Sequence, residues 1–213
     1  MNESSCVPDA CLDAALQDQF PLHIVGVFAP FEPLESAGLR LLMTARGLMI
    51  EACNGVQYLR DFLCAEKPQI ILPYGELAPL AKIVDDEANA TLVQYLHQAR
   101  ADSQENSDHE IVRLIVKAPG QQMRYIDAAS SASASYATYD LSQLRDGEEV
   151  IADVHSHACG NSYFSEVDNC DDLKFRGPLK LSLVFGNCNL HWMSMTTTYR
   201  YVARGKLFTA QES

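Results

Sequence analysis

The sequence predicts an α+β protein, built on a mixed β-sheet with flanking helices and preceded by a smaller N-terminal α/β region. Two observations predict this class: short apolar, strand-like runs outnumber helical patterns, and the helical patterns stand ahead of and amid the strands. The chain has 213 residues, of which 47% are hydrophobic. At roughly 100–200 residues per domain, this fits one large domain or two small ones. We place the boundary near residue 85, between an N-terminal region (1–85) and a second part (86–213).

The N-terminal region mixes strand and helix patterns. Leu22 to Phe28 is short, β-branched and bounded by prolines, which is typical of a strand. Two apolar runs within Gly38 to Ala52 predict a hairpin. Val56 to Cys64 has apolar residues at helical spacing and predicts a helix. The region carries no recognisable motif, so three roles stay open for it: substrate recognition, partner binding, or covering the sheet of the second part.

The second part opens with an amphipathic helix and continues as strands. The helix is predicted over Ala88 to Ser103, because apolar residues recur at helical spacing. A strand over Glu110 to Val116 and a partner over Met123 to Asp127 predict a hairpin. The Ala- and Ser-rich stretch Ala128 to Ala137 is too small and polar for a core, so we expect a mobile loop there.

Four further apolar runs predict the remaining strands. They are Val150–His157, Leu179–Phe185, Tyr199–Val202 and Lys206–Phe208. The last two flank a single Arg-Gly pair and predict a closing hairpin.

The net charge of the chain bears on the kinds of binding partner that we expect. The chain has 16 Lys and Arg against 28 Asp and Glu, a net charge of −12. A general nucleic-acid or anionic-membrane binder needs a basic surface to reach phosphates, so we expect neither partner. No apolar run approaches the roughly 20 residues that span a bilayer.

The seven cysteines and the first residues indicate the compartment. Their number is odd and no Cys-x-x-Cys pair occurs, which matches neither a secreted disulfide framework nor a four-thiolate zinc site. Met1 to Ser5 has no positive charge and no apolar stretch behind it, so we expect no secretory signal. These features predict reduced thiols in a cytoplasmic protein. The oligomeric state is not predictable from the sequence.

The segment that begins at Asp153 carries the candidate chemistry. Residues i and i+2 of a strand point to the same face, so His155 and His157 present two imidazoles side by side. Asp168, further along the chain, adds a carboxylate. Two imidazoles and a carboxylate form a three-ligand zinc set that leaves a position open for water, which is the catalytic type. Taken alone, a His-x-His pair is equally typical of an exposed polar face.

Neighbouring residues allow more than one interpretation. Ser165 and Asp168 also form the Ser-x-x-Asp pattern of a helix start, which is compatible with metal binding by Asp168. The thiolate of Cys159 could compete for a metal, or Cys159 is a plain loop thiol. Asp153 either orients an imidazole or faces solvent.

His155-x-His157, followed after seven residues by Ser165-x-x-Asp168, resembles the signature of the JAMM (JAB/MPN) metalloprotease family. The resemblance covers roughly residues 88 to 208. It implies the JAB/MPN, cytidine-deaminase-like fold and a Zn²⁺-dependent enzyme, a hydrolase that cleaves isopeptide or peptide bonds after ubiquitin-like or sulfur-carrier-like β-grasp proteins. More narrowly, the chain is similar to members encoded in bacterial gene cassettes beside a small ubiquitin-like protein and a ThiF-like activating enzyme, which are the partners we expect.

The resemblance also implies roles for two further residues. The family uses a Glu on the first strand of the domain to activate water, and Glu110 is our candidate because it opens the strand before Ile111. Glu105 and Glu76 are its rivals. Ser165 is expected to donate a hydrogen bond to the oxyanion. The chain departs from the family pattern after the second His, where Ala158 replaces the usual Pro, and after the Glu, where larger residues stand.

Two other functions fit the sequence less well than the metalloprotease. A catalytically silent MPN-type scaffold would mediate protein assembly, but silent relatives usually lose a metal residue and this chain keeps all three. A zinc deaminase uses His-x-Glu followed by Pro-Cys-x-x-Cys, and no Cys-x-x-Cys occurs here.

Overall fold

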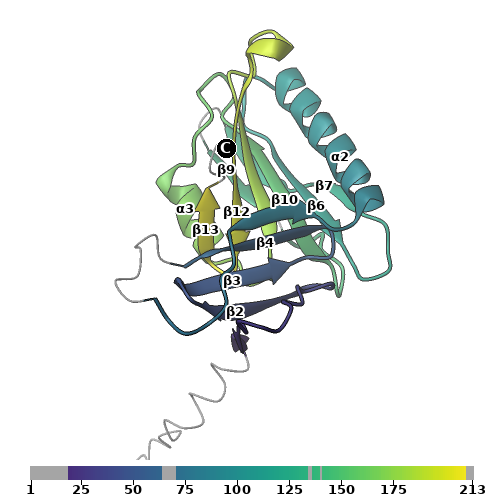
Figure 1. The fold of residues 1–213 in the computed structure, drawn as a ribbon. Coiled ribbons are helices and arrows are strands. Elements are labelled where there is room, and N and C mark those ends of the chain that lie inside the picture. Colours follow the sequence, from purple (N-terminus) through teal and green to yellow (C-terminus); the bar gives the residue numbers. More distant parts are fainter. Residues whose placement is uncertain (1–18, 64–70, 134–135, 140, 210–213) are drawn as a thin grey trace, which may run out of the picture.

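The structure is a computed structural model that describes residues 19–63, 71–133, 136–139 and 141–209. Its strands form a five-stranded sheet, a six-stranded sheet and a two-stranded ribbon (Figure 1). The six-stranded sheet is mixed and has a helix on each face, which confirms the predicted α+β class.

The N-terminal sheet has the strand order β1-β2-β3-β4-β5, with β1 parallel to β2 and every other pair antiparallel. Its strands are β1 (Leu22–Ile24), β2 (Gly38–Thr44), β3 (Gly47–Cys53), β4 (Gln57–Phe62) and β5 (Leu80–Ile83). The β2–β3 hairpin confirms the prediction over residues 38–52. The predicted strand from Leu22 to Phe28 ends at Ile24.

The helix predicted over Val56 to Cys64 is wrong, because Gln57 to Phe62 form strand β4. The turn before it explains the difference. The side-chain oxygen of Asn54 accepts hydrogen bonds from the backbone N–H groups of Val56 and Gln57, and Gly55 adopts a φ of 79° that favours glycine. This tight turn directs the chain back along β3, so strand pairing overrides the helical spacing.

The six-stranded sheet has the order β13-β12-β11-β10-β6-β7. Only β10 and β11 are parallel, and α3 provides the crossover between them. Each strand overlaps a predicted one, within two or three residues at most ends. The bounds are β6 (Val112–Lys117), β7 (Arg124–Asp127), β10 (Glu149–Ser156), β11 (Lys180–Gly186), β12 (Thr196–Ala203) and β13 (Lys206–Thr209).

Helices α2 (Asp86–Glu105) and α3 (Glu166–Leu173) cover opposite faces of this sheet (Figure 1). The predicted helix over 88–103 is therefore confirmed, and Asp85 caps its start by accepting a hydrogen bond from the Ala88 N–H at 2.9 Å. On the α2 side, Ala99 packs with Val154 of β10. Side chains alternate along a strand, so His155 points to the other face, where α3 lies.

A short ribbon replaces the loop expected over Ala128 to Ala137. Strands β8 (Ala129–Ser133) and β9 (Tyr136–Tyr139) pair antiparallel. Backbone N–H and C=O groups make the ladder, so a stretch of small residues can form it without an apolar face. The composition therefore misled the prediction about backbone structure.

The two large sheets share hydrophobic clusters. Ile50 and Leu59 of the N-terminal sheet pack with Leu179, Ala203 and Phe208. These last residues lie at the start of β11, the end of β12 and in β13, which is the end of the large sheet opposite to the carboxyl end of β10. The N-terminal sheet therefore covers one end of the large sheet and leaves the other end open. The division at residue 85 stays a prediction.

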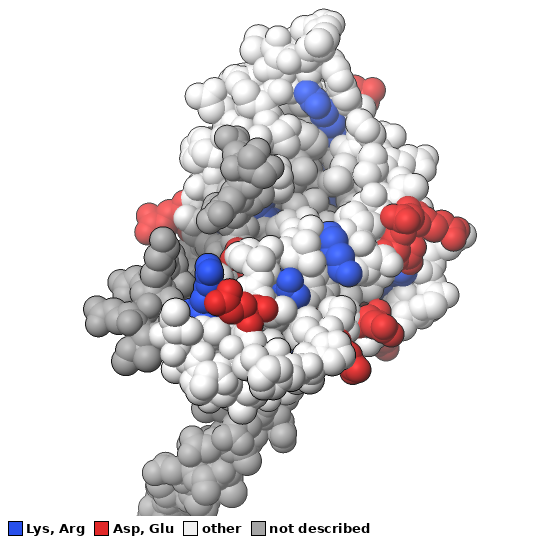
Figure 2. All heavy atoms as spheres, in the orientation of Figure 1, with Lys and Arg blue, Asp and Glu red and all other residues white. Residues whose placement is uncertain are grey.

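Charge is unevenly spread over the surface. On the face shown in Figure 2, acidic side chains gather beside the N-terminal end of α2, and lysine and arginine side chains are scattered among uncharged residues. Asp86 and Glu87 lie in the first turn of that helix, where carboxylates interact favourably with the helix dipole. Among the described residues, no helix is long and apolar enough to cross a membrane.

Candidate metal centre

Three predicted ligands converge on the α3 face of the large sheet. One ligand atom each from His155, His157 and Asp168 lies within 4.8 Å of the others. The Nε2 atom of His155 is 3.4 Å from Asp168 Oδ1, and the Nε2 atom of His157 is 3.9 Å from Asp168 Oδ2. Residues distant in sequence thus present two imidazole nitrogens and a carboxylate to one point.

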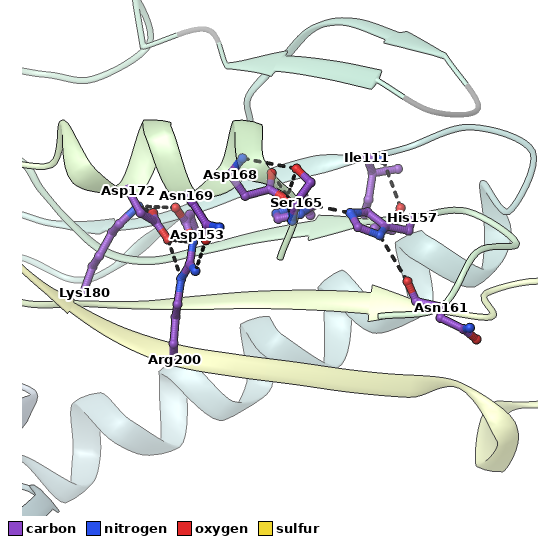
Figure 3. A network of polar contacts seen from close by, with 12 residues as sticks. Ile111, Asp153, His157, Asn161, Ser165, Asp168, Asn169, Asp172, Lys180 and Arg200 are labelled. Carbon is purple, nitrogen blue, oxygen red and sulfur yellow. Dashed lines mark hydrogen bonds and ion pairs between the residues drawn. The ribbon is translucent and has the colours of Figure 1, made fainter. Parts of the chain in front are cut away.

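Strand pairing places the two histidines. His155 lies in β10, between Val112 of β6 and Val184 of β11. His157 follows the strand, and its N–H donates to the Phe185 carbonyl at 2.8 Å. Its Nδ1 lies 3.1 Å from the Asn161 carbonyl oxygen, which requires the proton on Nδ1 and leaves the Nε2 lone pair facing Asp168 (Figure 3).

A tight turn after His157 replaces the family's usual proline. Ala158 adopts a φ of 47°, and the Gly160 N–H donates to the His157 carbonyl at 2.7 Å. Proline is locked near a φ of about −65°, so it could not occupy this position. The departure at Ala158 thus has a structural cause: this chain turns in a left-handed conformation immediately after the second imidazole.

Ser165 places Asp168 by capping α3. The Ser165 hydroxyl accepts a hydrogen bond from the Asp168 N–H at 3.2 Å and donates one to Asp168 Oδ2 at 2.7 Å. The Asp168 carboxylate also accepts from the Ser165 N–H at 2.7 Å, which completes a capping box. The predicted helix start is therefore present, and the same residues orient the carboxylate toward the imidazoles.

The chemistry of the three groups fits a metal ion. His155 is only 5% exposed, and neither of its ring nitrogens has a hydrogen-bond partner among the described residues. Burial and the neighbouring His155 lower the pKa of His157, which favours the neutral ring that a metal requires. Burial alone would raise the pKa of Asp168, but His155 and the hydrogen bonds of Ser165 hold it well below its usual range. The structure therefore offers two imidazoles and a carboxylate, a donor set that suits Zn²⁺.

Glu110 lies next to this cluster. Val112 pairs with His155, and the Ile111 carbonyl accepts the Ser156 N–H at 3.1 Å, so the chain before β6 continues along the end of β10. Burial raises the pKa of the Glu110 carboxyl; the charge of His155 opposes this shift and the charge of Asp168 adds to it. Glu110 is therefore half-buried and electrostatically coupled to two of the proposed ligands, although the regular strand begins only at Val112.

The rival glutamates lie elsewhere. Glu76 is exposed and lies 3.5 Å from Arg46 of the N-terminal part. Glu105 is exposed and is the last residue of α2. Cys159 is exposed and does not belong to the group of described residues that could hold a metal.

Asp153 takes neither of the roles expected for it. It is 3% exposed and forms a close ion pair with Lys180, so it does not face solvent. It does not orient an imidazole, because the ring nitrogens of His155 have no described hydrogen-bond partner. The reason is that α3 docks over this part of the sheet and encloses the carboxylate with Lys180.

A pocket of about 420 Å³ opens beside His155 and Asp168. Its walls are mainly apolar and come from the sheet and from α3, with Leu114, Val150, Val167 and Phe175 among them. An aromatic ring also contacts one imidazole: Tyr163 stands edge-on to His157, with ring centroids 4.6 Å apart.

Several supporting residues were missed by the sequence analysis. Asn161 holds His157 through its backbone carbonyl, which no side-chain pattern reveals. Arg200 is buried beneath α3, and its only sequence signal is a charge within a strand of otherwise uncharged residues. That signal does not tell which element the charge meets.

The fold and the site define an α+β protein with a His-His-Asp cluster at one end of a mixed sheet. Comparison with known families gives the same class: the family model described as "Prokaryotic homologs of the JAB domain" matches residues 92–199, just over half of the chain. The chain belongs to this family. A second model, described as a domain of unknown function (DUF2016), matches residues 10–83.

Comparisons with individual proteins add little. The search of the curated proteins found no match. Among solved structures, the chain is similar to the solution structure of protein DSY2949 from Desulfitobacterium hafniense, with 14% sequence identity and a TM-score of 0.41. That similarity covers 55% of this chain and 86% of the other.

Proposed function

We propose that this protein is a zinc-dependent peptidase or isopeptidase that cuts at the C-terminus of a ubiquitin-like or sulfur-carrier-like β-grasp protein. The observation that carries the proposal is the convergence of His155, His157 and Asp168, with Glu110 beside them. Membership of the JAB family supports it, since the cluster reproduces the metal signature of the active members.

The residues divide the chemistry among them. His155, His157 and Asp168 would hold Zn²⁺, which would supply Lewis acidity that lowers the pKa of a water molecule to about 7 and polarises the substrate carbonyl. Glu110 accepts a proton from the attacking water and passes it to the leaving amine. The Ser165 hydroxyl donates to the oxyanion. For this it must rotate away from Asp168 Oδ2, to which it donates in the structure.

The pocket supports a polypeptide substrate. Its apolar walls open beside the cluster, as a binding site for an extended chain end requires. The narrower likeness to protein A of the bacterial PRTRC cassette suggests which substrate to try first. That cassette encodes a small ubiquitin-like protein and a ThiF-like activating enzyme, and a hydrolase for the former would act in the cytoplasm.

The test uses the purified full chain loaded with one equivalent of Zn²⁺. It is incubated with the ubiquitin-like protein of the cassette carrying a short C-terminal peptide extension, and products are identified by intact mass. We expect release of the extension and no release after treatment with a chelator. Binding of the fusion without cleavage would instead support the silent scaffold.

Glu110→Gln is the decisive variant for the mechanism. Glutamine keeps the size of the side chain but cannot accept the proton, so we expect the rate to fall by about 10²–10⁴-fold. The zinc content should stay that of the wild type, because Glu110 is not among the three ligands. Full activity in this variant would rule out Glu110 as the base and leave Glu105 to be tried.

A further inference from the structure

Arg200 of β12 makes a buried connection to α3. The residue is 4% exposed, and its Nε donates to Asp172 Oδ2 at 2.8 Å. Its Nη2 lies 2.6 Å from the same oxygen, and its Nη1 donates to Asn169 Oδ1 at 2.5 Å. The planar guanidinium therefore binds Asp172 and Asn169, two side chains of α3, in a fixed geometry (Figure 3).

Those two side chains lie close to a proposed metal ligand along the chain. Asn169 is the residue after Asp168, and Asp172 is one helical turn beyond Asp168. A shift or rotation of α3 would therefore move the Asp168 carboxylate away from the imidazoles. The contacts of Arg200 fix the helix at the turn that carries this ligand.

Arg200 also supports the other side of the cluster. Its guanidinium carbon lies 3.7 Å from the centre of the Phe164 ring, a cation–π contact. Phe164 in turn stands edge-on to the His155 imidazole, with ring centroids 6.3 Å apart at 69°. Arg200 thus contacts Phe164, which lies against His155, and Asn169, which follows Asp168 in the chain.

The surrounding charges balance. Lys180 lies 2.6 Å from Asp172 Oδ1 and also pairs with Asp153, so two cations meet two carboxylates in this buried cluster. Burial would lower the pKa of Lys180, but the two carboxylates raise it, so its ammonium stays charged. The two cations and two carboxylates leave this cluster without net charge, and the contacts of Arg200 connect it to the metal cluster through α3 and Phe164.

We propose that Arg200 is a positioning residue of the metal centre, which holds the N-terminal turn of α3 and the Phe164 ring so that Asp168 and His155 meet at one ion. The inference rests on the metal site of the proposed function. Residues that orient metal ligands typically contribute about 10–100-fold to metal affinity. We assign that share of the zinc affinity to Arg200.

The test compares Arg200→Met with Arg113→Met. Methionine keeps much of the volume of the arginine side chain and removes the guanidinium group that makes the polar contacts. Arg113 is a matched control: it is 9% exposed, lies 3.0 Å from Asp102 and 2.7 Å from Asp127, and sits on the α2 side of the same sheet. The zinc Kd is measured on folded protein by competition with a chromophoric chelator, well below each thermal midpoint. Hydrogen exchange of the α3 amides is the second readout.

Both variants should lose thermal stability, because Arg200→Met breaks a buried ion pair and Arg113→Met breaks partly buried ones. We expect Arg200→Met alone to raise the zinc Kd by about 10–100-fold and to speed exchange in α3. If Arg200→Met does not fold, Asn169→Ala removes one contact of Arg200 at a half-buried position and should weaken zinc binding in the same direction. An unchanged zinc Kd in the folded Arg200 variant, or in Asn169→Ala where that variant is needed, overturns the positioning role. An equal rise of the zinc Kd in Arg113→Met also overturns the positioning role of Arg200. A wild type that binds no zinc overturns the metal site itself.

Discussion

At the scale of single residues, the cluster depends on backbone as much as on ligands. The loop that follows His157 lies directly over the end of β11, and its Asn161 carbonyl fixes the His157 ring. Gly186 is what allows this close approach. A Cβ placed on Gly186 would lie 2.1 Å from the Ser162 nitrogen and 2.4 Å from the Asn161 carbonyl carbon. Gly186, which is not among the proposed metal ligands, thus sets the position of the ligand His157.

Gly186→Ala should therefore disturb the site from outside it. The added methyl must push the 160–162 loop away, and overpacking of this kind costs about 1–3 kcal/mol. We expect a lower urea midpoint together with at least about a tenfold rise in the zinc Kd. Gly38→Ala is the control, because the nearest atom to its new Cβ would be 3.9 Å away. Equal zinc affinity in both variants would show that the loop adapts without moving His157.

The sequence predicted the convergence of the ligands but not their support. His155 and His157 share a strand face by simple alternation, and Asp168 follows a recognisable helix cap, so spacing alone indicated all three. The pairing of Asp153 with Lys180 depends on the register of β10 and β11, and the pairing of Asp172 with Arg200 depends on how α3 docks on the sheet. Local sequence contains no information about that docking.

At the scale of elements, one carboxylate of α2 makes several hydrogen bonds, two of them with side chains of the sheet. Asp102 accepts hydrogen bonds from Tyr125 at 2.7 Å, Arg113 at 3.0 Å and Gln98 at 2.7 Å. Burial raises the pKa of Asp102, but these donors outweigh burial and lower it below its usual range. The folded state thus binds the Asp102 proton less tightly than the unfolded state does.

The stability that Asp102 contributes should depend on pH. Because its folded pKa is depressed, the contribution is complete above the unfolded pKa of about 3.9 and is lost as the pH falls through the lower folded value. Asp102→Asn should cost roughly 1–3 kcal/mol at pH 7. The difference in the free energy of unfolding between this variant and the wild type should shrink as the pH is lowered below about 4. Urea unfolding across this range measures this difference, with the exposed Asp146→Asn as control; a difference that does not change with pH contradicts the assignment.

Whether a segment forms a helix or a strand was predictable where its apolar pattern agrees with its pairing in the folded sheet. The strands of the large sheet and helix α2 follow from apolar periodicity. Strand β4 did not, because the Asn54-Gly55 turn outweighs a short helical spacing. The β8–β9 ribbon did not either, because backbone pairing leaves no mark in a run of Ala and Ser.

At the scale of the whole molecule, the two large sheets are joined by a common core. Val56, immediately before β4, packs with Leu92 of α2 and with Ile115 and Ile151 of the large sheet. Together with the cluster around Leu59, this contact covers the end of the large sheet away from the metal cluster. Composition could not reveal the contact, because apolar residues on separate strands do not specify their partners.

The shared core predicts that both sheets unfold together. Leu59 is 4% exposed, and Leu59→Ala should cost about 2–5 kcal/mol. The single tryptophan, Trp192, lies beyond the N-terminal sheet, where Arg100 stacks on its ring at 4.2 Å. Its fluorescence transition should nevertheless shift by the full cost of the mutation. Leu22→Ala, at an exposed position of the same sheet, should leave it unchanged, and an unshifted Trp192 transition in Leu59→Ala would show that the sheets unfold independently.

The most direct test of the account is the zinc content of the purified chain, measured by atomic spectroscopy after equilibration with Zn²⁺ and removal of the excess. Because three ligands converge at one point, we predict one tightly bound zinc per chain. The metal should be lost in His157→Ala and kept in His23→Ala, an exposed histidine of β1. A wild-type chain that binds no zinc, or a His157→Ala variant that retains it, would contradict the central claim.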